Sequence, residues 1–416
     1  MAHNKVIIVL LGALTFLTAV APVFAADKEK VLYSFCSQSR CSDGKGPVAT
    51  LVFDAAGNLY GTTTLGGYYG CGCGTVFQLT PGGNATWSEI VLFAFDAYHG
   101  GDPTTPLVFD AAGNLYGTAA CCRYAAGGAV YKLRHANGAW KETVLFRFPC
   151  HRGICPDGDQ PYGVILGAPR NLYGTTAFGG ENYTNCGYGC GTAFVLTRAN
   201  NRWTENVVHN FGEGKDGYQP GAGPISDAAG NLYGTTQGGG AYGAGTVFQL
   251  TPGKNGSWSE KVLHSFNGRD GFNPQAVLVL DAAGNLYGTA LGGGAFDGGV
   301  AFKLVRGANG KWRRKILHNF GNGNDGASPS SELVFDPAGN LYGTTGSGGA
   351  FNQGTVFELT PGTNGGWAEK VLHSFGHGQD GADPIGSVIF DASGNLYGAT
   401  LSGGAHNGGT VFEITP

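Results

Sequence analysis

The chain has 416 residues, a net charge of −4 and only 13% charged residues. It contains no basic block, so the composition predicts no nucleic-acid partner. Its 76 glycines follow no three-residue period and 42% of residues are apolar, which excludes collagen and disorder and favours short strands joined by glycine-rich turns.

The first 25 residues have the features of a secretory signal peptide. Lys5 precedes an apolar run over residues 6–20, and Val23 and Ala25 supply the small residues that signal peptidase requires. The run is short for a membrane span, and an uncleaved N-terminal anchor is the alternative. We therefore expect a leader at 1–25, one domain at 26–416, and an exported (periplasmic, secreted or cell-surface) protein without a membrane span after cleavage.

The motif Asn-Leu-Tyr-Gly occurs seven times, and every copy lies within the same order of predicted elements. In the first copy, apolar residues 51–53 lead through a turn at 54–57 into a strand at 58–63. A glycine-rich loop then precedes a strand at 75–80, and a polar turn precedes a strand at 87–95. This spacing predicts an antiparallel meander of about 55 residues. The copies begin at Asn58, Asn114, Asn171, Asn231, Asn285, Asn340 and Asn395.

Seven such units predict an all-β, seven-bladed β-propeller, because a four-stranded sheet buries both faces only between two neighbours. Residues 31–35 resemble a fourth strand without a preceding blade, and residues 410–415 a third strand without a successor. We therefore predict that the N- and C-terminal strands pair to close the ring, and that the protein is a monomer. Glutamates in five fourth strands are interpreted as protection of the outermost edge: Glu89, Glu142, Glu205, Glu260 and Glu369.

Two segments carry a family resemblance: residues 227–236 (Asp-Ala-Ala-Gly-Asn-Leu-Tyr-Gly-Thr-Thr) and residues 245–252 (Gly-Thr-Val-Phe-Gln-Leu-Thr-Pro). With their copies, they resemble the Gloeo/Verruco (GloVer) tandem-repeat family of exported bacterial proteins over nearly the whole mature chain. The resemblance implies an exported repeat protein, often tethered by a C-terminal anchor, but no activity at particular residues. We recognise no anchor segment before Pro416. The repeat core is also similar to NHL and gluconolactonase-type propellers, in fold only.

In such a meander, the loops that join the second and third strands of a blade (2–3 loops) share one rim with the loops that lead from a fourth strand to the next blade (4–1 loops). We call this the ligand rim. Aromatic side chains in the 2–3 loops suit stacking against sugars or other flat ligands, and filling gaps between blades is the alternative. The candidates are Tyr69, Tyr242, Phe296, Phe351 and His406, with Tyr124 and Tyr183 one residue out of register.

All ten cysteines lie in the first three blades, where the loops depart from the repeat. An even number in an exported chain favours disulfides over a metal site, so we predict no metal. We expect one group of Cys36, Cys41, Cys71 and Cys73, a second group of Cys150, Cys155, Cys186 and Cys190, and the adjacent pair Cys121 and Cys122. These loops, together with Arg123, are where we expect ligand contact.

Two repeated polar patterns are interpreted as structural. Aspartates of Asp-Gly-x-x-Pro segments in the 4–1 loops could form a cation-binding ring, but Asx-turns are the favoured interpretation. They are Asp43, Asp157, Asp216, Asp270, Asp325 and Asp380. Histidines share one fourth-strand position with aromatic residues and are interpreted as packing residues: His209, His264, His318 and His373.

The first strands should line the propeller axis, where enzymes of this fold need converging polar groups. The matching positions hold one carboxylate and no histidine or cysteine: Thr50, Pro106, Gly163, Gly223, Val277, Glu332 and Ser387. We therefore predict no catalytic residues and no cofactor.

The sequence favours an exported, non-enzymatic binding or scaffold protein for an unknown ligand, with carbohydrates and small metabolites as candidates. One alternative is a propeller enzyme of the lyase or lactonase type that acts on a sugar-derived substrate. Another is a purely structural cell-surface protein.

Overall fold

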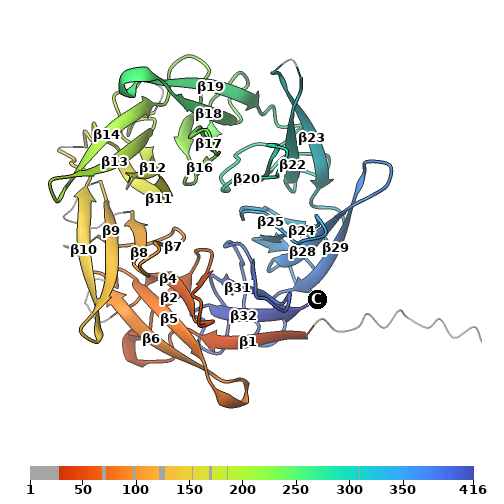
Figure 1. Cartoon of the computed structure of the whole chain (residues 1–416). Helices are drawn as coiled ribbons and strands as arrows, with labels where there is room; N and C mark the ends of the chain where they lie inside the picture. Colours follow the sequence, from red (N-terminus) through yellow and green to blue (C-terminus); the bar gives the residue numbers. More distant parts are fainter. Residues whose placement is uncertain are drawn as a thin grey trace, which may run out of the picture.

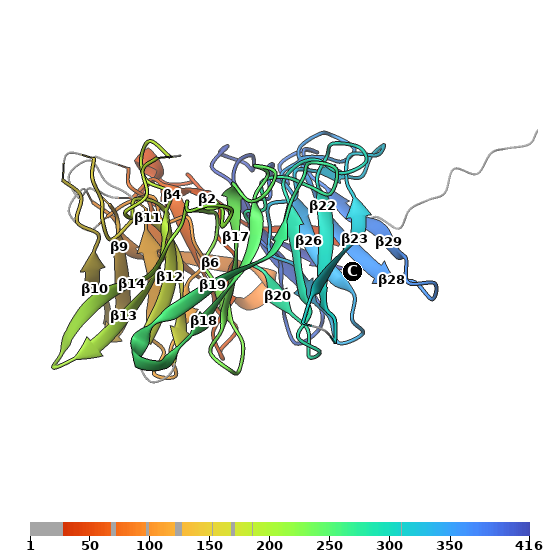
Figure 2. The ribbon, with the colours of Figure 1, turned by 90° about the horizontal axis from the view of Figure 1, so that it is seen from above.

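The computed structural model describes residues 28–67, 72–96, 100–120, 127–151, 153–167, 171–184, 186–308 and 310–416. Antiparallel sheets surround a central axis in a closed ring (Figure 1). Seen at 90° to that view, the strands run between the two rims of a disk (Figure 2). The ring has seven blades of four strands, which confirms the predicted fold class.

Blades 1 to 3 occupy the first half of the chain. Blade 1 comprises β2 (Lys45–Pro47), β3 (Val52–Phe53), β4 (Leu59–Leu65), β5 (Thr75–Pro81) and β6 (Trp87–Ala94). Blade 2 comprises β7 (Val108–Phe109), β8 (Leu115–Ala119), β9 (Ala129–Ala136) and β10 (Ala139–Arg147). Blade 3 comprises β11 (Asp159–Gly167), β12 (Asn171–Phe178), β13 (Thr192–Ala199) and β14 (Arg202–Asn210).

Blades 4 to 6 repeat this order. Blade 4 comprises β15 (Tyr218–Pro220), β16 (Ile225–Ser226), β17 (Leu232–Gly238), β18 (Thr246–Pro252) and β19 (Trp258–Ser265). Blade 5 comprises β20 (Val279–Leu280), β21 (Leu286–Ala290), β22 (Val300–Arg306) and β23 (Trp312–Asn319). Blade 6 comprises β25 (Val334–Phe335), β26 (Leu341–Thr345), β28 (Thr355–Pro361) and β29 (Trp367–Ser374), with a short extra pair, β24 (Gly326–Ala327) and β27 (Ser347–Gly348).

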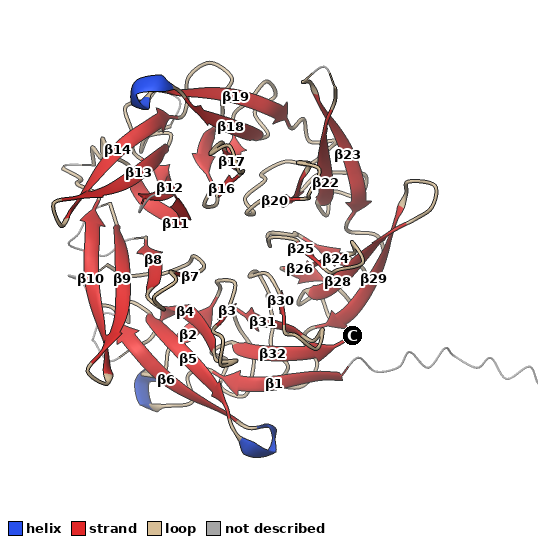
Figure 3. Cartoon of the chain, in the orientation of Figure 1, coloured by secondary structure: helices blue, strands red, loops and turns tan. Residues whose placement is uncertain are grey.

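Blade 7 joins the two ends of the chain. It comprises β30 (Ile389–Phe390), β31 (Leu396–Thr400), β32 (Thr410–Thr415) and, as its outermost strand, β1 (Lys28–Ser34). Strand β1 pairs antiparallel with β32, with Val31 opposite Phe412 and Ser34 opposite Thr410. The predicted closure is confirmed. The short 3-10 turns drawn as helices in Figure 3 are η1 (Ser39–Cys41), η2 (Gly83–Ala85) and η3 (Lys254–Gly256).

The Asn-Leu-Tyr-Gly motif is explained by local contacts, seen for example in blade 5. Asp281 in the preceding turn accepts hydrogen bonds from the side chains of Asn285 (2.7 Å) and Tyr287 (3.0 Å). The leucine of the motif is buried in the blade interface. The glycine is needed because a Cβ on Gly288 would lie 2.9 Å from the ring of Phe302.

An aromatic contact joins every pair of neighbouring blades. The phenylalanine that follows each fourth strand packs against an aromatic residue in the third strand of the next blade, and the pair Phe266–Phe302 has ring centroids 5.1 Å apart. The same contact recurs around the ring, including Phe35–Phe77 and Phe375–Phe412. Each such pair buries a large apolar area in an edge-on or tilted geometry that aromatic rings favour.

A second contact ties neighbouring blades at the ligand rim. Before the proline of each 4–1 loop lies a residue with positive φ, such as Ser328 (φ 59°), whose N–H donates to Gly298 O of the preceding blade (2.8 Å). Pro329 then packs over Gly299, where an added Cβ would lie 2.5 Å from the proline Cδ. The glycines under these prolines are Gly74, Gly128, Gly191, Gly245, Gly299, Gly354 and Gly409.

The sequence pattern indicates that the repeated fourth-strand glutamates protect an exposed edge, and the structure corrects this interpretation. Their side chains point into the interfaces between blades. In β6, Glu89 is in phase with the half-buried Trp87 and Val91, while Ser88 and Ile90 are exposed. The Glu89 Oε1 atom is buried without a hydrogen-bond partner in the described structure. Burial, reinforced by the Asp43 carboxylate of the neighbouring 4–1 loop, raises the pKa of Glu89 to about 8.

We expect Gly299→Ala to destabilise the ring strongly, because it adds both left-handed backbone strain and a clash with Pro329. The matched control is Gly284→Ala in the same blade, where φ is also positive (76°) but nothing lies within 4 Å of the added Cβ. Strain alone should cost about 1 kcal/mol, and the clash should raise the total to at least about 3 kcal/mol. Equal losses of thermal stability in the two variants would contradict this role of the proline contact.

We expect stability to fall as pH rises from about 4.5 to 8. Burial raises the pKa of four of these glutamates above 4.5, and it does the same for Glu29 in β1, the outermost strand of blade 7. The four are Glu89, Glu205, Glu260 and Glu369. The folded state therefore retains protons that the unfolded state has already lost. Glu89→Gln should raise the melting temperature at pH 8 but hardly at pH 5, whereas Glu181→Gln, at an exposed rim position, should change neither. A melting temperature for Glu89→Gln that is lowered at pH 8 would refute this explanation.

Candidate functional site

A cavity of about 710 Å³ lies on the propeller axis and is walled by the first strands and the residues that precede them. The seven axial positions identified in the sequence all line it: Thr50, Pro106, Gly163, Gly223, Val277, Glu332 and Ser387. Gln237, near the end of the second strand β17, and Ser347, in the short strand β27 that follows the second strand of blade 6, add to the wall on the ligand-rim side.

The wall is held by hydrogen bonds that cross from one blade to the next. Thr289 of β21 donates to Ser331 O of blade 6 (3.0 Å), and Thr344 of β26 donates to Gly386 O of blade 7 (2.9 Å). At the closure between blades 7 and 1, Ser387 N donates to Thr50 Oγ1 (3.2 Å). These bonds satisfy backbone groups of the wall, so a ligand would meet mainly side chains.

Only some of the polar side chains in the wall are available to a ligand. The Ser331 hydroxyl donates to the backbone oxygen of Thr344, and the Ser387 hydroxyl donates to that of Glu332. By contrast, the amides of Gln237 and Gln275 lack hydrogen-bond partners within the described structure. The Thr104 hydroxyl, also in the wall, is buried and unpartnered there.

Glu332 is the one charged residue among the described residues that line the cavity. The Glu332 carboxylate has no hydrogen-bond or ion-pair partner among the residues that the structure describes. Burial raises the pKa of Glu332 to about 7, because the charged form loses hydration without gaining a partner. The other titratable side chain in the wall is Tyr162, whose pKa burial also raises. The group at position 332 can accept a ligand hydrogen bond, hold a cation or exchange a proton.

The predicted rim aromatics of blades 4 to 7 are exposed and do not fill gaps between blades. Tyr242 is 68% exposed, Phe296 51% and Phe351 47%, and His406 is also exposed. Tyr183 is half-buried, and its hydroxyl accepts a hydrogen bond from Cys155 N (3.0 Å), which ties the 2–3 loop of blade 3 to the loop before that blade. Three further predicted contacts, Tyr69, Arg123 and Tyr124, lie outside the described residues.

Disulfides lie in the loops that depart from the repeat. The structure joins Cys36 to Cys41, Cys150 to Cys155 and Cys186 to Cys190, and Cys73 is disulfide-bonded as well. The remaining cysteines, Cys71, Cys121 and Cys122, lie outside the described residues.

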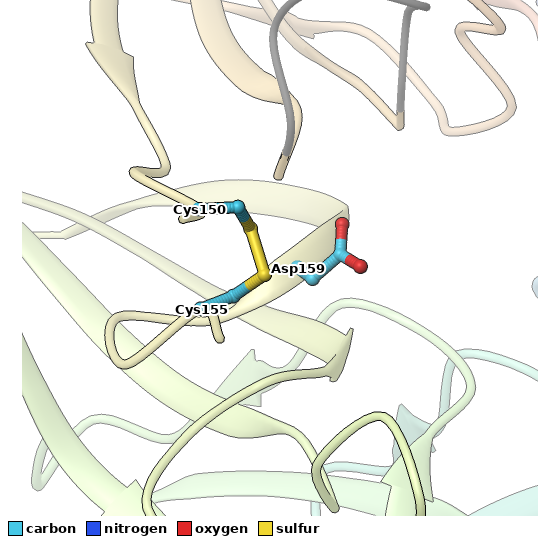
Figure 4. A group of neighbouring side chains, drawn as sticks. All are labelled: Cys150, Cys155 and Asp159. Carbon is cyan, nitrogen blue, oxygen red and sulfur yellow. A yellow bond between two sulfur atoms is a disulfide. The ribbon is translucent and has the colours of Figure 1, made fainter. Parts of the chain in front are cut away.

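One of these disulfides belongs to a cluster with metal-ligand residue types. The Cys150 and Cys155 sulfurs lie near an Asp159 carboxylate oxygen, all within 4.8 Å of one another. Figure 4 shows the two sulfur atoms bonded to each other, with the Asp159 carboxylate beside them. A disulfide presents no thiolate, so this cluster offers a metal only one carboxylate in the form described.

Four aspartates of the 4–1 loops are engaged with the histidines of the fourth strands that precede them. In blade 3, His209 Nε2 lies 3.0 Å from Asp216 Oδ2, and Asp216 Oδ1 accepts from Gly212 N. Three further pairs repeat the 3.0 Å separation: His264–Asp270, His318–Asp325 and His373–Asp380. Asp43 likewise accepts hydrogen bonds from the side chains of Tyr33 (2.9 Å) and Ser37 (2.8 Å). Five of the six aspartates therefore brace the loop that follows a fourth strand and are not available as a ligand ring.

Sequence reasoning located the axial wall but missed two of its available polar groups. Gln275 precedes the axial position Val277 by two residues and could have been identified as its neighbour in the wall, although both lie before β20, which begins at Val279. Gln237 lies near the end of β17, and nothing in the local sequence indicates that it faces the axis.

No helix in the described part of the chain is long and apolar enough to span a membrane.

Comparisons with solved structures show the same fold at low identity. A protein from Sulfolobus tokodaii described as a hypothetical selenium-binding protein has 12% identity and a TM-score of 0.53, covering 75% of this chain and 74% of its own. A protein from Lactobacillus plantarum has 15% identity and a TM-score of 0.51, covering 82% and 95%. No curated protein matches at a significant level. The Gloeobacter/Verrucomicrobia repeat matches residues 20–186, 74–258, 124–320 and 254–416, so the chain belongs to this repeat family.

Proposed function

We propose that this chain is an exported, non-enzymatic binding propeller that holds a small neutral polar molecule, such as a sugar or sugar-derived metabolite, in its axial cavity. The observation that carries the proposal is the convergence of unpartnered polar side chains on one cavity: Gln237, Gln275 and Glu332. Its volume of about 710 Å³ lies within the range typical of small-molecule sites.

The chemistry of the wall suits hydroxyl-rich ligands. An amide side chain donates and accepts hydrogen bonds, and so can pair with a sugar hydroxyl in either direction. Apolar wall residues such as Val277 and Ile385 provide surface for the C–H groups of such a ligand. Export is supported by the disulfides, because such bonds persist mainly in oxidising compartments.

Glu332 favours a second candidate, an enzyme acting on a sugar-derived substrate in the same cavity. A carboxyl group with a pKa of about 7 suits general acid–base catalysis near neutral pH. The binding function is preferred because the cavity lining described here offers Glu332 no second carboxylate or histidine. The ligand contact predicted on the rim of blades 1 to 3 stays a prediction, with Tyr69, Arg123 and Tyr183 as its test positions.

We expect a screen of mono- and oligosaccharides by calorimetry to identify a ligand whose affinity depends on the two cavity glutamines. Gln237→Ala and Gln275→Ala should each weaken binding by roughly 2- to 10-fold, the effect of one lost hydrogen bond. The matched control is Gln249→Ala in β18, whose amide donates to Thr251 Oγ1 (3.1 Å) in the middle of the blade.

Two outcomes would count against this proposal. Unchanged affinity in both cavity variants would place the ligand elsewhere, and losses at the rim positions instead would locate it there. Conversion of the ligand to product, abolished by Glu332→Gln, would replace the binding function with the enzymatic one.

A further inference from the structure

A groove of about 860 Å³ between the outer strands of blades 2 and 3 collects positive charge on a chain whose net charge is −4. Among its described lining residues are six cations and no carboxylate. The cations are Lys132, Arg134, Lys141, Arg147, Arg198 and Arg202. They are spread over two hairpins at mostly alternate positions, which is why the sequence shows no basic block.

The strand register explains how these cations converge. In blade 2, Arg134 of β9 pairs with Lys141 of β10, and Lys132 pairs with Thr143, so all four side chains lie on one face of the hairpin. In blade 3, Arg198 of β13 pairs with Trp203 of β14. Trp203 packs against the core that blades 2 and 3 share, so the Arg198 side of its hairpin faces blade 2.

Two of the cations have partners within the fold. Lys132 lies 3.7 Å from an Asp110 carboxylate oxygen and 5.1 Å from the centre of the Tyr116 ring. Arg198 donates to the Asn201 side chain (3.2 Å).

The other four cations are Arg134, Lys141, Arg147 and Arg202, and all four are exposed. None forms an ion pair within the described residues. Like charges held together in this way repel one another, and an anion bound between them would relieve that repulsion.

The same face of other blades is different. In blade 1, the positions of Lys132, Arg134 and Lys141 hold Gln78, Thr80 and Ser88. Blade 5 has Lys303, Arg313 and Lys315, but it holds Val305 where blade 2 has Arg134, and blade 6 offers Pro361 where blade 3 has Arg198. The concentration of charge thus belongs to this groove and not to the repeat.

We propose that the groove between blades 2 and 3 binds an acidic polysaccharide through its carboxylates, with Arg134, Lys141 and Arg202 as principal contacts. Guanidinium groups pair with carboxylates in a two-bond geometry that a flexible sugar acid can adopt. The proposal does not depend on the axial cavity, which is lined by different residues.

The surroundings of the groove favour a polysaccharide over a nucleic acid. Sequence-tolerant binding of single-stranded nucleic acid relies on exposed aromatic faces for base stacking. Of the aromatic residues that line the groove, Tyr116 is 7% exposed, and Phe146 and Trp203 are half-buried against the core, so none is an exposed stacking platform. The disulfides also indicate an oxidising compartment, where a polysaccharide is the more accessible polyanion.

The test measures binding of oligogalacturonate to the full mature chain by calorimetry at low and at physiological salt. The triple variant R134A/K141A/R202A should lose at least about tenfold in affinity, since each exposed charge pair contributes up to about fivefold. Its affinity should also depend less steeply on salt concentration than that of the unmodified chain. Because these side chains are exposed, the melting temperature should stay unchanged.

The matched control is R313A/K315A, which removes two exposed cations from the corresponding hairpin of blade 5 and should bind almost normally. A fully methyl-esterified oligogalacturonate of the same length should not bind. If both variants lost the same affinity for oligogalacturonate, the loss would reflect the overall charge of the protein, and the proposal would be overturned. So would normal binding by the triple variant, or tighter binding of a single-stranded oligonucleotide of equal charge.

Discussion

The contact between the proline of each 4–1 loop and a glycine of the preceding blade is the constraint on which the ring depends. At that point two backbones approach so closely that a single Cβ has no room. Seven copies of one contact impose one spacing between neighbours, and a closed ring needs this uniformity. The aromatic pairs farther out, such as Phe266–Phe302, then fill the wedge between blades. The width of the axial cavity follows from these contacts, because they determine how near the first strands come to the axis.

Much of this architecture could be predicted because the same local sequence pattern occurs in all seven repeats. Blade number, strand order and closure follow from repeat counting and from the two unmatched terminal strands. The axial wall follows as well, because alignment of the copies identifies one first-strand position in each blade. The interpretation of Glu89 failed where alternation was ignored: Trp87, Glu89 and Val91 share a face, and that face is turned inward.

The remaining features depend on contacts between blades, which no single repeat contains. The basic groove needs the facing sides of blades 2 and 3, and its cations are separated in the chain by the whole of β11 and β12. The unpartnered amide of Gln237 becomes part of a cavity wall only because the first strands of other blades surround it. Repetition therefore predicts the scaffold, whereas positions that depart from it give the surface its chemical character. Glu332, the one charged residue among the described residues of the cavity wall, is an example.

The two candidate sites have opposite electrostatics, and this limits what each can accept. An acidic polymer gains from the six cations of the groove but meets a single buried carboxyl group at the axis. If Glu332 is ionised, it repels a sugar acid, and if it is protonated, it donates one hydrogen bond to a neutral hydroxyl or a carbonyl. The lack of any basic residue in the described cavity lining leaves a carboxylate ligand without compensation there. A neutral small molecule at the axis and a polyanion between the outer strands can thus occupy the propeller together without competing for either site.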